Sequence, residues 1–223
     1  AEADFVLSEV PVTDCVAHVR RDLSPVEAGR FFVYGSHDAG KVPDDRVALL
    51  IEAAMAFGTG HHGTTLGCLR ALDRLIDEGV HARRTVDIGC GTAVLAMAAA
   101  KTWPETVLAS DIDAVAVEVA DANVAANDLA GRVTCIEATG FDHEALRGDS
   151  RFDLIFANIL KGPLLAMAPE LSAALETGGS AILSGILTHQ ADDVIAIYAE
   201  NGLNLARRDD IVDWTTLTLR KYA

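Results

Sequence analysis

Two glycines after an aspartate are the strongest chemical signal in the sequence. The segment "VDIGCGTAVLA" (86–96) has the pattern of a strand that ends at Asp87, a turn that contains Gly89 and Gly91, and a helix. Glycines in such a turn let a ligand touch the backbone, because no Cβ stands in the way, and the helix N-terminus favours a negative group. A tight strand–helix turn without a ligand is the alternative.

An acidic residue after the next predicted strand supports a ligand. Asp111 lies in "SDID" (110–113), twenty residues after Gly91. A carboxylate there can accept hydrogen bonds from both hydroxyls of a ribose. The turn and the acid together predict a cofactor that contains a nucleoside. The dinucleotide fingerprint has a third glycine where this chain has Val94, which disfavours a nicotinamide cofactor.

A third signal is the segment "ANILKGPL" (157–164), which ends the fourth predicted strand. The carboxyl ends of parallel strands share one edge of a sheet, where such folds bind their ligands. This place in the strand order makes Asn158 a candidate catalytic residue. An Asn that caps a turn before Pro163 is the alternative.

A glycine-rich stretch with two adjacent histidines precedes these motifs. In "AFGTGHHGTT" (56–65), an apolar run ends and a helical pattern begins beside His61 and His62. A metal site, a phosphate cradle and a cofactor gate would each have roughly this composition. Adjacent side chains of an extended segment point to different sides, so the two histidines are poor joint ligands and no metal site is predicted.

Short β-branched runs alternate with Ala-rich helical patterns from about residue 80 onward. This alternation predicts an α/β fold with a doubly wound, seven-stranded, mostly parallel sheet that helices cover on both faces. The predicted strands are 84–89, 106–113, 132–138, 152–160 and 180–187, followed by a C-terminal antiparallel hairpin of 203–210 and 213–221. The predicted helices are 93–101, 114–128, a segment from Pro163 to about 177–179, and 189–202.

The chain before residue 80 has a weaker pattern. The segment "TTLGCLRALDRLIDEG" (64–79) places aliphatic side chains on one stripe, which predicts an amphipathic helix against the sheet. A short helix is expected near 14–23 and a strand near 30–35.

Composition and charge limit the class of partner. Half of the 223 residues are apolar, which is enough for a substantial core, and the formal net charge is −15. Negative charge disfavours nucleic acid as a partner; it fits a basic partner protein, or it serves solubility alone. The four widely spaced cysteines argue against a zinc knuckle and a disulfide framework, and indicate a cytoplasmic protein. No apolar segment approaches the roughly 20 residues of a membrane span.

Taken in order, "AFGTGHHGTT", "DIGCGTAVLA", "NILKGPL" and "SGIL" with Gln190 resemble the PrmA-type methyltransferases, which modify large-subunit ribosomal protein eleven. The resemblance runs from about Asp14 to the C-terminus and includes "RRDL" and "DWTTLTLRK". The D-x-G-C-G pattern also resembles the first motif of the wider class I S-adenosylmethionine-dependent methyltransferases. Ala93 departs from that motif, because many members have a third glycine there.

The resemblance implies S-adenosyl-L-methionine as the cofactor and an amine of a basic ribosomal protein as the substrate, either a lysine side chain or the N-terminal amine. It also implies a glycine–threonine loop that closes over the cofactor. The implied cofactor-binding residues are Phe57, Gly58, Thr59, Gly60, Thr65, Asp87, Gly89, Gly91, Asp111, Ile112 and Asn158. The implied catalytic residues are Asn158 and Ile159.

Methyl transfer from a sulfonium is an in-line displacement that requires no metal and no covalent enzyme intermediate. The pKa of a free lysine amine is about 10.4, so the amine needs a dry pocket to lose its proton. We expect the Asn158 side chain and the carbonyls of Asn158 and Ile159 to orient the amine, while Phe57 and the loop 58–65 exclude water. Three rivals stay open: a methyltransferase for another protein or a small molecule, a nucleotide-dependent oxidoreductase, and a non-catalytic binding module.

The resemblance also sets an expectation for domain organisation. Residues 1–45 are expected to be a linker helix and the remnant of an N-terminal substrate-recognition domain, and residues 46–223 the methyltransferase domain. The linker-like "RRDL" begins at Arg20, and a small domain needs roughly 50 residues. We therefore expect the chain to keep its cofactor pocket, within residues 56–187, and to lack most of a recognition module. We also expect a monomer.

Overall fold

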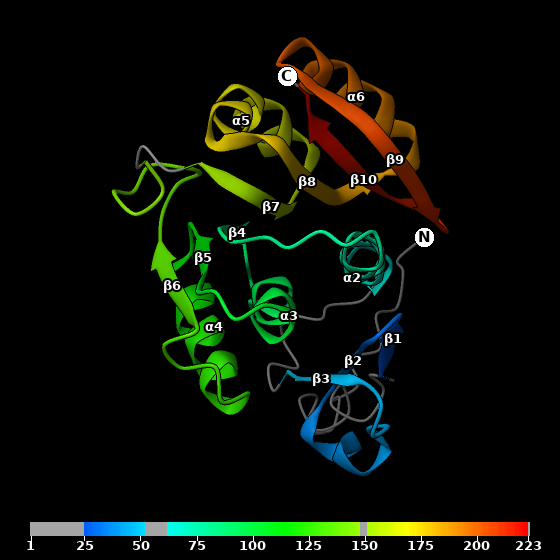
Figure 1. Cartoon of the computed structure of the whole chain (residues 1–223), viewed down its shortest axis with the longest axis vertical. Helices are drawn as coiled ribbons and strands as arrows, with labels where there is room; N and C mark the ends of the chain where they lie inside the picture. Colours follow the sequence, from blue (N-terminus) through cyan, green and yellow to red (C-terminus); the bar gives the residue numbers. More distant parts are fainter. Residues whose placement is uncertain (1–24, 52–61, 148–150, 223) are drawn as a thin grey trace, which may run out of the picture.

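The structure is a computed structural model that describes residues 25–51, 62–147 and 151–222. These residues form two sheets and a set of helices, and the larger sheet lies between two helical layers (Figure 1). The smaller sheet lies beyond the layer that contains α2 and α3 (Figure 1).

The elements have the following bounds. The strands are β1 (Val26–Ala28), β2 (Phe31–Tyr34), β3 (Val47–Leu50), β4 (Thr85–Ile88), β5 (Val107–Asp111), β6 (Val133–Glu137), β7 (Phe152–Asn158), β8 (Leu175–Leu187), β9 (Leu203–Ile211) and β10 (Trp214–Lys221). The helices are α2 (His62–Asp77), α3 (Val94–Thr102), α4 (Ala114–Ala126), α5 (Lys161–Ala174) and α6 (Ala191–Glu200), with 3-10 turns η1 (Ser36–Lys41) and η2 (Thr188–Gln190).

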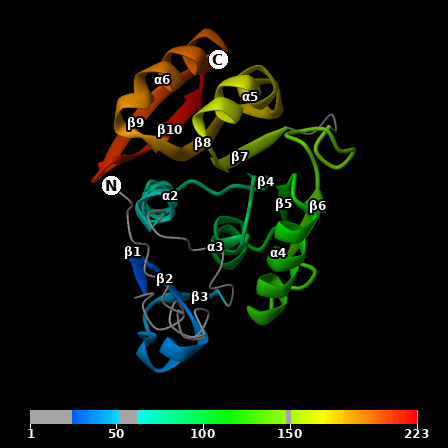
Figure 2. The same cartoon turned by 180° about the vertical axis from the view of Figure 1, so that it is seen from behind.

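The larger sheet has the strand order β6-β5-β4-β7-β8-β10-β9. Strands β4 to β8 run parallel, and β10 is antiparallel to both of its neighbours, β8 and β9. Figure 2 shows the terminal hairpin at one end of the sheet and β6 at the other. The predicted fold class is therefore confirmed, and the carboxyl ends of β4, β5 and β7 meet at one edge of the sheet.

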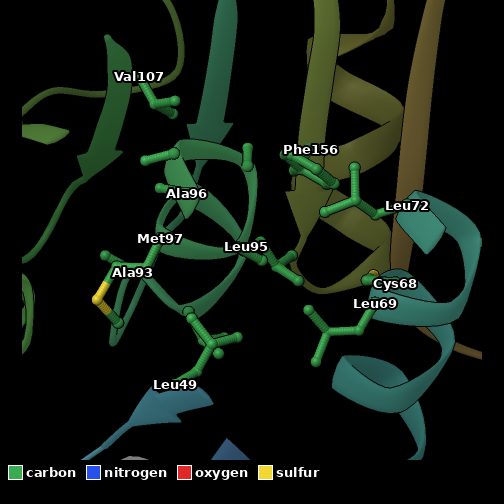
Figure 3. Packing of buried hydrophobic residues seen from close by; sticks show 14 of the residues in the cluster. Leu49, Cys68, Leu69, Leu72, Ala93, Leu95, Ala96, Met97, Val107 and Phe156 are labelled. Carbon is green, nitrogen blue, oxygen red and sulfur yellow. The ribbon is translucent and has the colours of Figure 1, made fainter. Parts of the chain in front are cut away.

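Helices α2, α3 and α4 cover one face of the sheet, and α5 and α6 cover the other (Figures 1 and 2). Helix α3 lies between the sheet, α2 and the smaller sheet, and all its residues from Val94 to Ala100 are buried. Figure 3 shows Leu49 of β3, Leu69 of α2 and Phe156 of β7 around this helix. A helix that is apolar on every side needs cover on every side, which explains its Ala-rich sequence.

The smaller sheet has the order β1-β2-β3, with β1 antiparallel and β3 parallel to β2. The predicted strand near 30–35 is confirmed as β2. Side chains attach the sheet to the larger unit: Lys101 Nζ donates to Ala48 O at 2.8 Å, and Asn127 Nδ2 donates to Leu50 O at 2.7 Å. The helix expected near 14–23 lies outside the described residues.

Helix α5 differs from the prediction at both ends. It begins at Lys161, before Pro163, because a proline in the first turn of a helix loses no intrahelical hydrogen bond. It ends at Ala174 and not near 177–179, because Leu175 already pairs with Phe152 as the first residue of β8. No helix of the described residues is long and apolar enough to cross a membrane.

Candidate active site

The turn between β4 and α3 is built from residues in the left-handed backbone region. The angle φ is 68° at Gly89, 52° at Gly91 and 59° at Ala93. A Cβ at Gly89 would lie 2.3 Å from Cγ2 of Ile159, so only glycine fits there. The left-handed conformation of Ala93 costs about 1–2 kcal/mol for a residue with a Cβ, which explains why a third glycine suits this position.

Asp111, at the end of β5, is held by two backbone groups. Its Oδ2 accepts a hydrogen bond from the N–H of Gly91 at 2.9 Å, and its Oδ1 accepts one from the N–H of Asp113 at 3.1 Å. The Gly91 bond joins the glycine turn to the neighbouring strand. The carboxylate is therefore fixed at the mouth of the turn, where the sequence predicts the ribose.

Asp87 is buried beneath the turn and has one oxygen without a partner. The residue is 1% exposed, and its Oδ2 accepts a hydrogen bond from the N–H of Ala96 at 3.2 Å. Its Oδ1 has no hydrogen-bond partner among the described residues. Burial, reinforced by the charge of Asp111, outweighs the Ala96 hydrogen bond and raises the pKa of Asp87 to about 7. A buried acceptor without a donor is costly, so this atom fits a ligand that brings a donor.

Asn158, at the end of β7, touches the start of α2. Its Nδ2 donates to Oγ1 of Thr64 at 3.3 Å. Helix α2 can lie this close because Gly67 faces Thr216 of β10, where a Cβ on residue 67 would come within 2.1 Å of the hydroxyl oxygen. The Thr64 contact holds the amide by its nitrogen and leaves its oxygen to accept a hydrogen bond.

The backbone of Ile159 is held by a glycine from the next strand. A Cβ at Gly185 of β8, where φ is 83°, would lie 2.3 Å from the carbonyl oxygen of Ile159. The missing side chain lets the segment after β7 lie directly on β8. Ile159 thereby sits between two glycines, Gly89 and Gly185, and its carbonyl has a fixed position.

Two adjoining hollows follow this edge of the sheet. A cavity of about 260 Å³ lies between the glycine turn, the start of α2 and the end of β7. A groove of about 1120 Å³ runs from Asp111 past the segment after β6 and along α5. Gly89, Ile159 and Leu160 line both hollows. One ligand with a polar end and a larger, flatter end could therefore occupy both.

Exposed apolar side chains border the groove. Ile112 is 68% exposed and Leu160 is 67% exposed, and both line it. Large exposed apolar side chains around a hollow are typical of a site that a ligand covers. A planar base fits such a surface, next to the ribose-binding position at Asp111.

All of the sequence-predicted site residues that the structure describes line these hollows. Those at the cavity are Thr65, Asp87, Gly89, Gly91, Asn158 and Ile159. Those at the groove are Gly89, Asp111, Ile112 and Ile159. Phe57, Gly58, Thr59, Gly60 and His61 lie outside the described residues. Within the described ranges, no group of three or more His, Cys, Asp or Glu side chains could hold a metal ion.

Some residues of the site have no signal in the local sequence pattern. Thr64 and Gly185 are two of them, and both contact the segment Asn158–Ile159. The groove residues Ala138 to Asp142 follow β6 at the same edge. The rule that ligands bind at the carboxyl ends of parallel strands could have found that segment.

Comparisons with known proteins agree on one family. The family model described as ribosomal protein L11 methyltransferase (PrmA) matches residues 1–222. The ribosomal protein L11 methyltransferase of Brucella melitensis biotype 2 is 45% identical over 216 residues, which cover 97% of this chain and 75% of that protein. The corresponding protein of a Chelativorans species is 46% identical over 219 residues, covering 98% of this chain and 75% of its own length.

Solved structures agree with this assignment. The ribosomal protein L11 methylase of Lactobacillus delbrueckii subsp. bulgaricus has a TM-score of 0.77 at 26% identity, covering 90% of this chain and 100% of that one. A methyltransferase from Pyrococcus furiosus has a TM-score of 0.55 at 19% identity, covering 68% and 83% of the two chains, and shares the fold alone. The chain belongs to the ribosomal protein L11 methyltransferase (PrmA) family.

Proposed function

We propose that the protein transfers methyl groups from S-adenosyl-L-methionine to amino groups of ribosomal protein L11, on lysine side chains, the N-terminal amine, or both. The observation that carries this proposal is the position of Asn158. Its amide lies at the end of β7, in the same cavity as the glycine turn. Methyl transfer to an amine requires a hydrogen-bond acceptor that orients the amine and a turn that binds the cofactor. The Asn158 amide and the glycine turn are candidates for these two roles in one cavity.

The residues present fit the cofactor. The turn at Gly89 and Gly91 offers backbone without side chains, and the free Oδ1 of Asp87 suits a positively charged donor. Asp111 would accept hydrogen bonds from the ribose hydroxyls, and Ile112 would flank the adenine. We also propose cofactor contacts for Thr65 and for the segment Phe57, Gly58, Thr59 and Gly60. The contacts of residues 57–60 rest on the sequence alone.

The bound cofactor supplies an activated methyl group on a sulfonium. The protein has to bring a neutral amine into line with that methyl group. The Asn158 oxygen and the carbonyl of Ile159 are acceptors that would take the amine's hydrogens and so direct its lone pair. Burial of the amine between the cofactor and the protein would favour the neutral amine over the ammonium, because burial disfavours the charged form.

The formal net charge of −15 supports a basic ribosomal protein as the partner and disfavours direct contact with nucleic acid. We propose that the enzyme acts as a monomer in the cytoplasm, where ribosomal proteins are made. We also propose that residues 1–45 contain a linker helix and part of a substrate-recognition domain, and that residues 46–223 form the methyltransferase domain.

The test is mass spectrometry of purified ribosomal protein L11 after incubation with the protein and S-adenosylmethionine. We expect added methyl groups on amines, and a fall in turnover of about 100-fold or more for Asn158→Ala, because misplaced reactants lose rate by that order. Asn201→Ala is the matched control, since the Asn201 side chain lies away from the cavity, with its Nδ2 donating to Ile197 O of α6 at 2.9 Å. Unmodified ribosomal protein, or equal rates for the two variants, would contradict the proposal.

A further inference from the structure

Strand β8 has a β-bulge beside the segment Asn158–Ile159. The pairing of β8 with β10 shifts by one residue there, so Thr216 alone lies opposite both Ser184 and Gly185. Ser184 is the register partner of Asn158 in β7. Gly185, where φ is 83°, packs on the carbonyl of Ile159. Bulges re-aim side chains and are common next to active sites, and this one adjoins both residues that are proposed to orient the amine.

The hydroxyl of Ser184 fastens the bulge to β10. The residue is fully buried, and its Oγ donates to the carbonyl of Thr215 at 2.9 Å and lies 3.0 Å from Oγ1 of Thr216. A serine hydroxyl has one hydrogen. Because the Thr215 carbonyl takes it, the Thr216 hydroxyl has to donate to Ser184. The thiol of Cys68 on α2 interacts with both hydroxyls, so this buried cluster links α2, β10 and the bulge.

The same cluster determines how α2 lies on the sheet. A Cβ on Gly67 would lie 2.1 Å from Oγ1 of Thr216, so the helix backbone rests on this hydroxyl. Thr64, three residues earlier in α2, accepts the hydrogen bond from Nδ2 of Asn158 at 3.3 Å. That distance is at the long end of the hydrogen-bond range. A small shift of the helix on Thr216 would therefore release the amide of Asn158.

We propose that Ser184 is a positioning residue for methyl transfer: its hydroxyl, together with that of Thr216, holds the carbonyl of Ile159 and the amide of Asn158 in their places relative to each other. The bulge holds the carbonyl through Gly185, and the seat of α2 holds the amide through Thr64. This inference rests on the proposed function, in which the two groups orient the amine. It adds the buried hydroxyls that keep them aligned.

The sheet order separates this role from cofactor binding. Strands β4 and β5, which carry the glycine turn and Asp111, lie on one side of β7, whereas β8 and β10 lie on the other. Loss of a hydroxyl from the cluster should therefore disturb the alignment of the amine and leave the cofactor's ribose contact as it is. The expected signature is a loss of turnover without a loss of cofactor affinity.

The experiment compares Ser184→Ala and Thr216→Val with the unaltered protein, in methylation of ribosomal protein L11 and in calorimetry with S-adenosylhomocysteine. We expect kcat to fall about 10- to 100-fold, because misplacement by about 1 Å can cost 100-fold. The KM for the protein substrate should stay within about twofold, as for an interaction felt only in the transition state. Affinity for S-adenosylhomocysteine should be unchanged. Thr216→Ser, which keeps the hydroxyl, should restore most of the turnover.

Thr218→Val is the matched control. Thr218 is buried on the same face of β10 but pairs with Ile182, one step away from the bulge, so its loss should leave kcat unaltered. If Ser184→Ala fails to fold, the Thr216 variants decide, because valine keeps the shape of threonine.

Parent-like kcat in Thr216→Val, an equal loss in Thr216→Ser and Thr216→Val, or a loss of cofactor affinity as large as the loss of kcat would each overturn the inference and leave the proposed function intact. Absence of methylation by the unaltered protein would overturn the proposed function and this inference with it.

Discussion

The cavity and the groove differ in how far the protein fixes the groups that meet a ligand. The cavity of about 260 Å³ has walls that hydrogen bonds hold, from Asn158 to Thr64 and from Gly91 to Asp111. The groove of about 1120 Å³ is bordered by apolar side chains that stand in solvent. We therefore propose that the charged end of the ligand meets preformed polar groups, whereas the nucleoside end meets a surface that the ligand itself covers.

The largest change is expected from Gly89→Ala, which breaks the junction of the two hollows. The positive φ of 68° costs about 1–2 kcal/mol for alanine, and the contact with Ile159 adds roughly 1–3 kcal/mol of overpacking. Urea denaturation should show the free energy of unfolding lower by about 2–5 kcal/mol. Gly79→Ala is the control, because its φ is 81° and no heavy atom lies within 4 Å of the added Cβ. Equal losses would contradict the close contact at Gly89.

A smaller effect should follow from Asp111→Ala, which removes the polar group at the mouth of the groove. Hydrogen bonds to a charged group contribute about 1.5–3 kcal/mol, so the affinity for S-adenosylhomocysteine should fall about 10- to 100-fold by calorimetry. Asp113→Ala is the control: Asp113 caps α4 by accepting from the N–H of Val115 at 2.9 Å. Its loss should cost about 1 kcal/mol of stability and leave affinity unchanged. The same fall in affinity for both variants would place the ribose elsewhere.

The third effect is spread over several pH units, and its change per pH unit is the smallest of the three. The pKa of Asp87 rises from 3.8 to about 7 on folding, so between these values the folded protein keeps a proton that the unfolded chain has lost. This contribution to stability is present below about pH 4 and is lost as pH rises through about 7, with a slope of at most about 1.4 kcal/mol per pH unit. Thermal unfolding between pH 5 and pH 8 should show this decline in the protein and not in Asp87→Asn. Identical pH profiles would mean that the carboxyl is not buried as described.

The sequence predicts the parts of the site that depend on local pattern. Gly89, Asp111 and Asn158 each follow a recognisable strand, and the alternation of strands and helices places the three strand ends at one edge. Ala93 stands where many class I methyltransferases have a third glycine, and its backbone has the left-handed conformation that favours glycine.

The parts that the sequence does not predict depend on contacts between distant segments. Gly185 packs on Ile159, and Thr64 bonds to Asn158 ninety-four positions away. The local sequence does not show which glycine will pack against the backbone of a distant segment. The smaller sheet is another case, since β3 pairs in parallel with β2 and is held by Asn127, far along the chain. The hollows themselves arise from these distant contacts.

We propose that one ligand lies across the cavity and the groove in one orientation. A crystal structure of the protein with S-adenosylhomocysteine is the decisive test. We predict ribose hydroxyls on the Asp111 carboxylate, adenine in the groove beside Ile112, and the ligand's ammonium on Oδ1 of Asp87. A ligand bound in the reverse orientation, with its nucleoside in the cavity, or one bound outside both hollows, would contradict the account.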